Sequence, residues 1–251
     1  MLTVRNLSKS FGGVAAVQDV SFSIEPKTIH SVIGPNGAGK TTLFNLISGV
    51  YTPTRGEILV EDANVTEKRP DELARLGMSR TFQNLQICMN MSAIENVMVG
   101  AHLRLKTSFW RGMLRLPSMG RAERECRDEC AALMEFAGVG AYVDVQASQM
   151  SYGALKRLEI ARAMASKPRL LLLDEPAAGL NHTETAEIGA LIRKVADSGV
   201  TVMLVEHDMK LVMSLSDRIL VLDYGKKLAE GTAAEVRANP DVIAAYLGAA
   251  A

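Results

Sequence analysis

The stretch GPNGAGKTT at residues 34–42 decides the fold of this chain. It matches the pattern G-x-x-x-x-G-K-[ST] in full, follows the apolar run TIHSVI, and opens a predicted helix near Lys40. The glycines let the backbone bend so that successive main-chain N–H groups converge on phosphate oxygens, and the start of a helix adds about half a positive charge. We therefore predict a phosphate-binding loop that joins a strand to a helix.

The side chains of this loop have separate predicted tasks. Lys40 is expected to reach the β- and γ-phosphates of a nucleotide, Thr41 to supply a hydroxyl to Mg²⁺, and Thr42 to donate to the α-phosphate. The complete set of predicted nucleotide-binding residues in the loop is Gly34, Pro35, Asn36, Gly37, Ala38, Gly39, Lys40, Thr41 and Thr42.

A second stretch, RLLLLDEP at residues 169–176, is predicted to be a buried strand that ends in two carboxylates. Pro176 prevents the strand from simply continuing. Asp174 is placed to hold Mg²⁺ through water, and Glu175 is placed to accept the proton of an attacking water molecule. With the phosphate-binding loop, this pair indicates an enzyme that acts on a nucleoside triphosphate, and kinases, GTPases, helicases and recombinases all fit.

The rest of the chain divides by its pattern of apolar residues. Strand-like runs dominate residues 1–62, helical segments replace them over about 84–150, and strands alternate with helices from residue 151 onward. Such alternation predicts a parallel sheet with right-handed crossovers. We expect an α/β fold with a mixed sheet and a helical insertion.

Composition excludes several functional classes. The 28 basic residues equal the 28 acidic ones, so no overall field attracts the chain to nucleic acid or to an anionic membrane. No apolar run approaches the roughly 20 residues that cross a bilayer. The N-terminal residues MLTVRNLSKSF lack the pattern of a secretory signal. We expect a cytoplasmic chain without a nucleic-acid partner.

The stretch MSYGALKRLEIARAMASKP at residues 150–168 distinguishes among the nucleotide-binding classes. Ser151 is a good N-cap residue, Gly153 permits close approach of a ligand, and apolar residues then recur at helical spacing. With SYG followed by RLEIARA just before the acidic strand, the segment resembles the signature helix of the ATP-binding cassette (ABC) family. The resemblance implies an α/β fold: a P-loop NTPase core of the RecA-like type with a mixed sheet, an antiparallel β subdomain and an inserted α-helical subdomain.

The resemblance also implies how the chain is divided. Residues 1–251 form a single ABC ATPase domain, with the nucleotide-binding core and β subdomain in 1–83 and 151–251. Residues 84–150 form the helical subdomain, and the signature helix starts at 151.

ABC ATPases work as pairs that face head to tail, and the signature residues of one subunit close over the ATP of the other. This implies that Ser151 and Gly153 bind the partner's ATP. Ala154 replaces the family's usual glutamine or acid, and Asn181, in AAGLNHTE, replaces an aspartate that lines the dimer seam. Ala154 implies weaker contact with nucleotide across the interface or a site of unequal activity, while Asn181 keeps hydrogen bonding possible and removes a charge.

Further family positions follow in the expected order. In RTFQNL, Gln83 matches the glutamine that touches Mg²⁺ and the attacking water and links to the permease. In VMLVEHD, His207 matches the switch histidine that contacts the γ-phosphate and Glu175. In KSFGGVAAV, Phe11 matches the aromatic that stacks on adenine. The family therefore implies ATP and Mg²⁺ as cofactors, with Glu175, His207 and Gln83 as catalytic residues and Thr41, Gln83 and Asp174 at the metal.

Longer phrases, among them RTFQNLQIC and DEPAAGLNHTET, are most similar to the ATPase subunits of high-affinity branched-chain amino acid importers. The helical segment at about 101–130 resembles the larger of the two ATPase subunits in such systems. The implied partners are a second ABC ATPase subunit in a heterodimer, with a homodimer as the alternative, two transmembrane permease subunits, and indirectly an external solute-binding protein. The ATPase would be peripheral on the inner face of the cell membrane.

Several alternatives stay open at this point. Importers of urea or short amides belong to the same branch, and exporters use the same ATPase. A stand-alone ABC ATPase acting on ribosomes or DNA, and a P-loop kinase for a small molecule, are more distant alternatives.

Two surface hypotheses concern the helical region. Residues 101–121 carry five basic residues, no acidic one, and Trp110. This suggests either contact with lipid headgroups or the permease through Trp110, Arg104, Lys106, Arg111 and Arg115, or a solvated face. Methionines such as Met89 and Met91 are expected to pack in the core, with a docking surface for a permease helix near Gln83 as the alternative.

Overall fold

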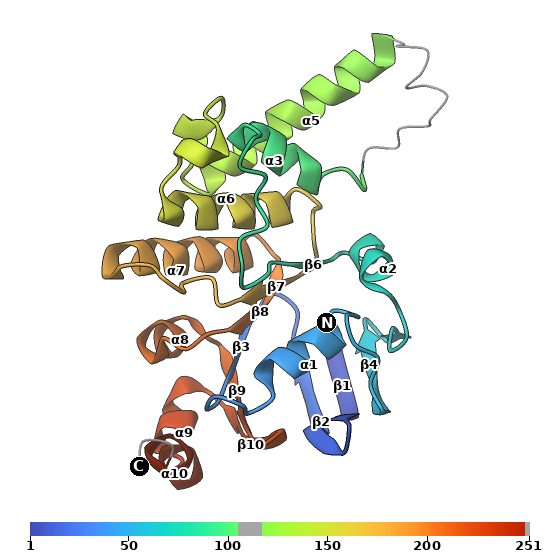
Figure 1. Cartoon of the computed structure of the whole chain (residues 1–251), viewed down its shortest axis with the longest axis vertical. Coiled ribbons are helices and arrows are strands. Elements are labelled where there is room, and N and C mark those ends of the chain that lie inside the picture. Colours follow the sequence, from blue (N-terminus) through green and yellow to red (C-terminus); the bar gives the residue numbers. More distant parts are fainter. Residues whose placement is uncertain (105–116, 249–251) are drawn as a thin grey trace.

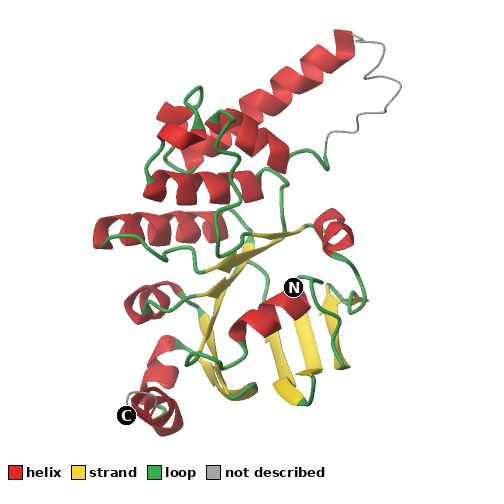
Figure 2. Ribbon diagram, in the orientation of Figure 1, coloured by secondary structure: helices red, strands yellow, loops and turns green. Residues whose placement is uncertain are grey.

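The computed structural model describes residues 1–104 and 117–248, and within these ranges the chain forms two sheets and the helices that cover them (Figures 1 and 2). The larger sheet has six strands in the order β10-β9-β3-β8-β7-β6. Strands β6, β7, β8, β3 and β9 run parallel, and β10 is antiparallel to β9. The mixed sheet predicted from the sequence is therefore confirmed. The strands are β3 (Ile29–Ile33), β6 (Met78–Arg80), β7 (Leu170–Asp174), β8 (Thr201–Val205), β9 (Arg218–Asp223) and β10 (Lys226–Gly231).

The smaller sheet is antiparallel and has the order β2-β1-β4-β5. Its strands are β1 (Leu2–Phe11), β2 (Val14–Ile24), β4 (Arg55–Val60) and β5 (Ala63–Asn64). In Figure 1 it lies beside helix α1 (Lys40–Ile47), on the side of the larger sheet away from most of the other helices. The predicted antiparallel β subdomain is thus present.

Strand β7 shows why the two faces of the larger sheet are both covered. Successive side chains of a strand point to opposite faces. Leu170 and Leu172 pack in one cluster with α1 and the smaller sheet, while Leu171 and Leu173 pack in another with the helices of the opposite face. All four are fully buried, as expected for a strand inside a parallel sheet.

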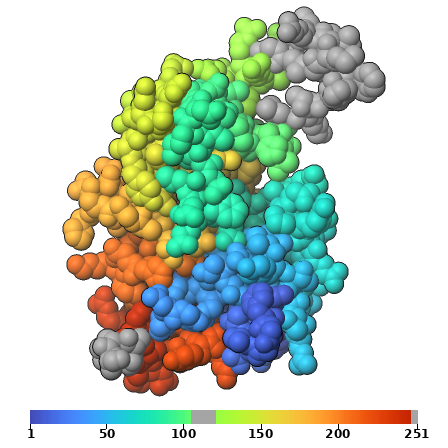
Figure 3. All heavy atoms as spheres, in the orientation of Figure 1, coloured from blue at the N-terminus to red at the C-terminus, as the bar shows by residue number. Residues whose placement is uncertain are grey.

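Between β6 and β7 the described chain is helical. It contains α3 (Ala93–Gly100), α5 (Pro117–Phe136), the short 3₁₀ helices η1 (Gly140–Tyr142) and η2 (Ala147–Gln149), and α6 (Tyr152–Met164). Ser92 starts α3 with a capping box, since its hydroxyl accepts from the Glu95 N–H and Glu95 accepts from the Ser92 N–H. In the space-filling view, the segment after β6 runs up the front of the molecule from the blue N-terminal part toward the helices (Figure 3).

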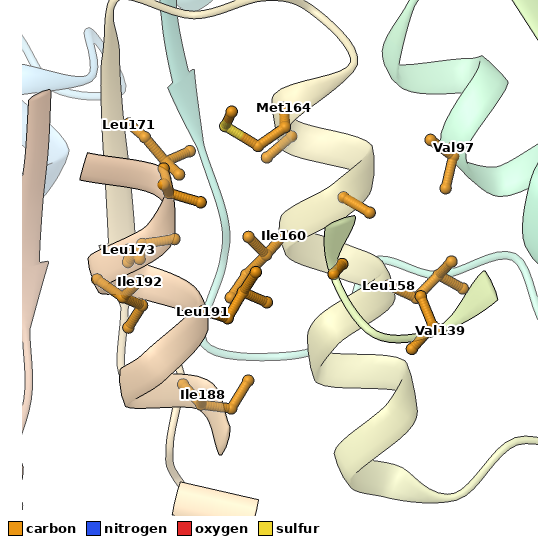
Figure 4. Close-up of a cluster of buried hydrophobic side chains, with 14 of the residues drawn as sticks. Val97, Val139, Leu158, Ile160, Met164, Leu171, Leu173, Ile188, Leu191 and Ile192 are labelled. Carbon is orange, nitrogen blue, oxygen red and sulfur yellow. The ribbon is translucent and has the colours of Figure 1, made fainter. Parts of the chain in front are cut away.

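Helix α6 is buried on two sides. Figure 4 shows Ile160 of α6 next to Leu191 of α7 (His182–Asp197), and Leu158 of α6 next to Val139 on the other side. The apolar residues recur at helical spacing, as the sequence indicated, and α6 lies between α7 and the helices α3 and α5. A helix in this position must be apolar on both sides.

The C-terminal helices cover the edge of the larger sheet formed by β9 and β10. They are α8 (Met209–Leu215), α9 (Ala233–Ala238) and α10 (Pro240–Gly248), and they pack around a small cluster that includes Val212, Val236 and Val242. The sequence pattern did not predict α2 (Pro70–Arg75) or β6, because six and three residues are too few for a clear period.

Within the described residues no helix is long and apolar enough to cross a membrane. Most of the basic segment, including Trp110, Lys106, Arg111 and Arg115, lies outside the described residues. Arg104 is described, and its side chain is 29% exposed. Its guanidinium donates to the Ala165 carbonyl at 3.0 Å and to Glu129 at 2.7 Å, so these two contacts would compete with binding to lipid headgroups.

His30 on β3 makes the stability of this fold sensitive to acid. The side chain is 1% exposed and its Nε2 has no hydrogen-bond partner among the described residues. Burial lowers the pKa of His30 to about 4, although the nearby Glu230 carboxylate opposes this shift. The folded state therefore excludes a proton that the unfolded chain accepts below its own pKa of 6.5.

We predict that the His30 contribution to stability is complete above pH 6.5 and is lost as the pH falls toward 4. Between pH 7.5 and pH 5 the free energy of unfolding should decrease by about 2 kcal/mol more in the wild-type chain than in His30→Leu. Urea unfolding of both proteins at the two pH values measures this difference. An equal decrease in both would mean that His30 is protonated in the folded state.

Candidate active site

The phosphate-binding loop lies between the end of β3 and the start of α1, as predicted. Gly39 is the N-cap of α1 and has a φ of 95°, which favours glycine. A Cβ atom at Gly39 would lie 2.5 Å from the carbonyl oxygen of Ala16, and one at Gly34 would lie against the carbonyl of Leu222. The loop is thus packed against β2 and β9 so closely that only glycine fits at these two positions.

Lys40, the first residue of α1, is held by its own loop. Its Nζ donates to the carbonyl oxygens of Gly34 at 2.7 Å and Pro35 at 2.9 Å, and the residue is only 6% exposed. Burial lowers the pKa of Lys40, and the Glu175 carboxylate partly opposes this. A buried ammonium at a helix N-terminus, with only carbonyl oxygens as hydrogen-bond partners, is suited to a phosphate group.

Glu175 is where three predicted catalytic residues meet. The Gln83 Nε2 donates to Glu175 Oε2 at 3.1 Å, and His207 Nε2 lies 2.7 Å from Glu175 Oε1. These side chains come from the segments that follow β6, β7 and β8, which end at the same edge of the sheet. Each oxygen of the Glu175 carboxylate therefore has a side-chain partner, and the two contacts fix the orientation of the carboxylate.

The backbone around Glu175 turns sharply. Glu175 has a φ of 49°, which is unusual for a residue other than glycine, and its N–H donates to the carbonyl of Val205 at 2.9 Å. The chain leaves β7 at this point, so the side chain faces the phosphate-binding loop.

Glu206 supports this arrangement, and the sequence analysis missed it. It is 4% exposed, and its carboxylate accepts from the N–H of Ala177 at 2.7 Å and of His207 at 2.9 Å. It therefore joins the segment after Glu175 to the segment that carries His207. The stretch VEHD contained the signal, because a carboxylate directly after an apolar strand is a candidate for holding main-chain N–H groups.

A hollow of about 270 Å³ brings the predicted residues together. It is lined by Ala16, residues 36–42, Glu175 and His207. Its walls hence carry the main-chain N–H groups of the loop, one ammonium, two threonine hydroxyls and the carboxylate of Glu175. This donor and acceptor set fits the phosphates of a nucleotide together with a magnesium ion.

Asp174, a predicted metal ligand, already has a cationic partner. Arg80 Nη2 donates to Asp174 Oδ2 at 2.9 Å, and Arg80 Nη1 donates to Asn45 and Ser48 at the end of α1. Burial raises the pKa of Asp174, and the Arg80 guanidinium opposes this. The sequence analysis missed Arg80, since no local pattern shows that an arginine at the end of a short strand is buried.

Ser151 and Gly153 lie apart from this hollow. Ser151 is the exposed N-cap of α6 and its hydroxyl accepts from the Ala154 N–H at 3.3 Å. Gly153 packs so closely on Glu184 that a Cβ atom would lie 2.5 Å from Glu184 Oε1. Ala154 is fully buried in the helical core, so its side chain does not face an open surface where a nucleotide could bind.

Asn181 has a structural role as the N-cap of α7. Its Oδ1 accepts from the N–H groups of Thr183 and Glu184, each at 3.0 Å, and Glu184 accepts from the Asn181 N–H. An aspartate would form the same cap, so the replacement changes the charge at this exposed position and leaves the helix start intact.

Phe11, the predicted adenine-stacking residue, does not line the hollow. It ends β1, is 43% exposed, and meets Tyr51 edge to face with ring centroids 5.3 Å apart. The ammonium of Lys9 lies 5.1 Å from the centre of the Phe11 ring. Phe11 and Tyr51 therefore form an exposed aromatic pair that is not part of the lining of the hollow.

Comparison with known proteins agrees with this geometry. A family model described as "ABC transporter" matches residues 17–178, and one described as "Branched-chain amino acid ATP-binding cassette transporter" matches residues 226–251. The chain is 47% identical over 251 residues to the high-affinity branched-chain amino acid transport ATP-binding protein LivG of Escherichia coli K12, covering all of this chain and 98% of LivG. It is 46% identical to BraF of Pseudomonas aeruginosa, which has the same description, with the same coverage.

Solved structures give the same result for the fold. The crystal structure of the ADP conformation of an ATP-binding cassette of an ABC transporter superposes with a TM-score of 0.87 at 30% identity, covering 99% of this chain and 98% of that one. A dimeric ATP-binding cassette in a post-hydrolysis state, bound to ADP and Pi, has a TM-score of 0.76 at 26% identity, with 93% and 99% covered. The matched loop, the acidic strand end and the full-length similarity together show that the chain belongs to the ABC transporter family as an ATP-binding subunit.

Proposed function

We propose that this chain is the ATP-hydrolysing subunit of an importer for branched-chain amino acids. The observation that carries the proposal is the placement of Gln83 and His207 on the two oxygens of Glu175, beside the phosphate-binding loop. The similarity to LivG and BraF over the full length supports the choice of cargo.

ATP would be held by residues 34–42, with Lys40 on its phosphates and Phe11 near its base. Thr41, Gln83 and Asp174 would hold Mg²⁺, which stabilises the negative charge that develops during phosphoryl transfer. Arg80 keeps the Asp174 carboxylate at the strand end, where it faces α1.

Hydrolysis requires a group that removes a proton from the attacking water. Glu175 suits this role because its carboxylate lines the hollow and is fixed by two side chains. Gln83 donates to it, and His207 holds its other oxygen. Glu206 positions His207 by accepting the His207 N–H.

A second cassette would complete the site. Ser151 and Gly153 open α6, whose N-terminus presents unpaired main-chain N–H groups and a partial positive charge suited to a phosphate. We therefore propose that Ser151 and Gly153 contact the ATP of a second ABC ATPase subunit, in a heterodimer or a homodimer. One of the solved cassettes described above is dimeric, which supports such pairing. We place the assembly on the inner face of the cell membrane with two permease subunits and an external solute-binding protein.

The permease would dock on a largely apolar hollow of about 310 Å³ between the helical region and the rest of the chain. Phe82, Val99 and Leu103 line it, together with Arg80 and Glu159. Met89 and Met91, which the alternative interpretation of the sequence associated with a docking surface near Gln83, do not line this hollow. We propose that a short cytoplasmic helix of the permease occupies it.

We also propose the division expected from the family, with 1–83 and 151–251 as the nucleotide-binding part and 84–150 as the helical part. Helix α6 lies at the boundary between the two parts, because it packs on α3 and α5 on one side and on α7 on the other.

We predict that Glu175→Gln keeps ATP binding but lowers the turnover number by about 10² to 10⁴, because only the proton acceptor is lost. Lys40→Ala should instead abolish most binding. Equilibrium binding of a fluorescent ATP analogue and phosphate release measure the two properties separately. Unchanged turnover in Glu175→Gln would show that another group accepts the proton.

We predict that Ser151→Arg impairs the ATP site of the partner cassette and spares the site on this chain. In the assembled transporter, photolabelling with an azido-ATP should fall several-fold on the partner and remain within about twofold on this chain. Ser198→Arg, at the exposed C-terminus of α7, is the matched control and should change neither. Loss of labelling on this chain alone would contradict the head-to-tail arrangement.

We predict that Leu103→Asp weakens attachment to the permease, because a charge in the apolar hollow must be desolvated when the permease helix docks. Leu103 is 39% exposed, so the folded chain should tolerate the change. Co-purification with the permease should decrease about tenfold while ATP binding by the free chain stays the same. Ile243→Asp on α10, 47% exposed, is the control. Equal co-purification of both variants would show that the permease does not dock in this hollow.

A further inference from the structure

Three charged side chains on one face of α6 contact the main chain of the segment that carries Gln83. Lys156, Glu159 and Arg162 are spaced by three residues, so they lie along one side of the helix. Lys156 Nζ donates to the Gln83 carbonyl at 3.4 Å, the Gln86 N–H donates to Glu159 Oε1 at 3.4 Å, and Arg162 Nη1 donates to the Gln86 carbonyl. We name these three residues the polar row.

The segment that they contact has little support of its own. Within the part of the chain that the structure describes, residues 82–86 belong to no helix or strand and form no hydrogen bond from main chain to main chain. The side chains of the polar row therefore supply hydrogen-bond partners for main-chain groups that a helix or strand would otherwise pair with each other. The Gln83 amide can meet Glu175 only while this segment keeps its shape.

The polar row is costly to keep inside the protein. Lys156 is 2% exposed and Glu159 is 6% exposed. Burial raises the pKa of Glu159, while the Lys156 ammonium and the main-chain N–H groups of Gln86 and Phe82 oppose this. Apolar side chains of similar volume would often fill such a space with greater stability. Packing alone therefore does not account for two buried charges at this place.

Helix α6 carries both the polar row and a residue that we propose to contact a second cassette. The same helix begins at Ser151, which is 5 residues before Lys156 and exposed. One helix therefore carries both the exposed Ser151 and the polar row. Glu159 and Arg162 line the apolar hollow as well, together with Phe82 and Gln86.

We propose that the polar row is a positioning device that fixes the main chain of residues 82–86 to α6 and thereby holds the Gln83 amide against Glu175. Lys156, Glu159 and Arg162 are positioning residues, since they act through Gln83 and touch no reacting atom. The proposal rests on the roles proposed above for Gln83 and Glu175.

The test replaces Lys156 by methionine, which keeps the length and helix preference of the side chain and removes the donor. In the assembled transporter, Lys156→Met should lower kcat for ATP hydrolysis about tenfold and leave KM for ATP within about twofold, because the phosphate-binding loop is untouched. Lys156→Arg restores a donor and should return kcat to within about threefold of wild type.

The matched control is Lys194→Met. Lys194 on α7 also donates to a main-chain carbonyl, that of Phe136 at 3.0 Å, and lies 4.2 Å from an aromatic ring centre. It makes the same kind of contact far from Glu175, so its loss should leave kcat unchanged. A similar fall of kcat in both lysine variants would overturn the proposal, because it would indicate a general loss of structure.

A double-mutant cycle tests whether Lys156 acts through Gln83. In the Gln83→Ala background, Lys156→Met should have no further effect on kcat, because the side chain that it positions is gone. If the fold-changes in kcat of the two single substitutions multiply in the double mutant, the proposal is overturned. If Gln83→Ala alone leaves kcat unchanged, the proposed role of Gln83 fails; if it lowers kcat while Lys156→Met does not, only the polar row fails.

Hydrogen exchange gives a readout that does not depend on hydrolysis. In the nucleotide-free chain, the main-chain amides of residues 82–88 should exchange several-fold faster in Lys156→Met than in wild type or in Lys194→Met. If Lys156→Met does not fold, Arg162→Met is measured in the same way. Unchanged exchange in a folded variant would contradict the proposal.

Discussion

The pairing of β3, β8 and β7 in parallel is the constraint on which the site depends. Parallel strands that pair in register end at one edge of the sheet, and the segments that follow them must lie side by side. The phosphate-binding loop follows β3, Glu175 follows β7, and His207 follows β8. The hydrogen bonds of the sheet thus bring together residues that are far apart in the sequence.

Buried charge then fixes the details at this edge. Arg80 joins Asp174 to the end of α1, Glu206 joins the segments that carry Glu175 and His207, and Lys40 lies against its own loop. Each buried ion has hydrogen-bond partners, as the cost of desolvation requires. Hydrogen bonds thus fix the orientation of Asp174, Glu206 and Lys40 at this edge.

Two elements connect this edge to the outside. Helix α6 begins at the exposed Ser151 and contacts the segment of Gln83, and the apolar hollow, where we propose that the permease docks, lies beside that segment. The proposed sites for nucleotide, partner cassette and permease are thus connected through α6 and the segment of Gln83.

The sequence by itself determined the phosphate-binding loop, the acidic strand end, the alternation of strands and helices, and the family. These features are local, because glycines, an N-cap or a run of apolar residues act over a few positions and leave a pattern. Only the tertiary structure decided that Arg80 is buried against Asp174, that Glu206 bridges two segments, that Ala154 faces the core, that α6 is covered on both sides, and that the apolar hollow lies at Leu103 and not at Met89. Burial and pairing across a fold depend on neighbours distant in the chain, and no local pattern contains them.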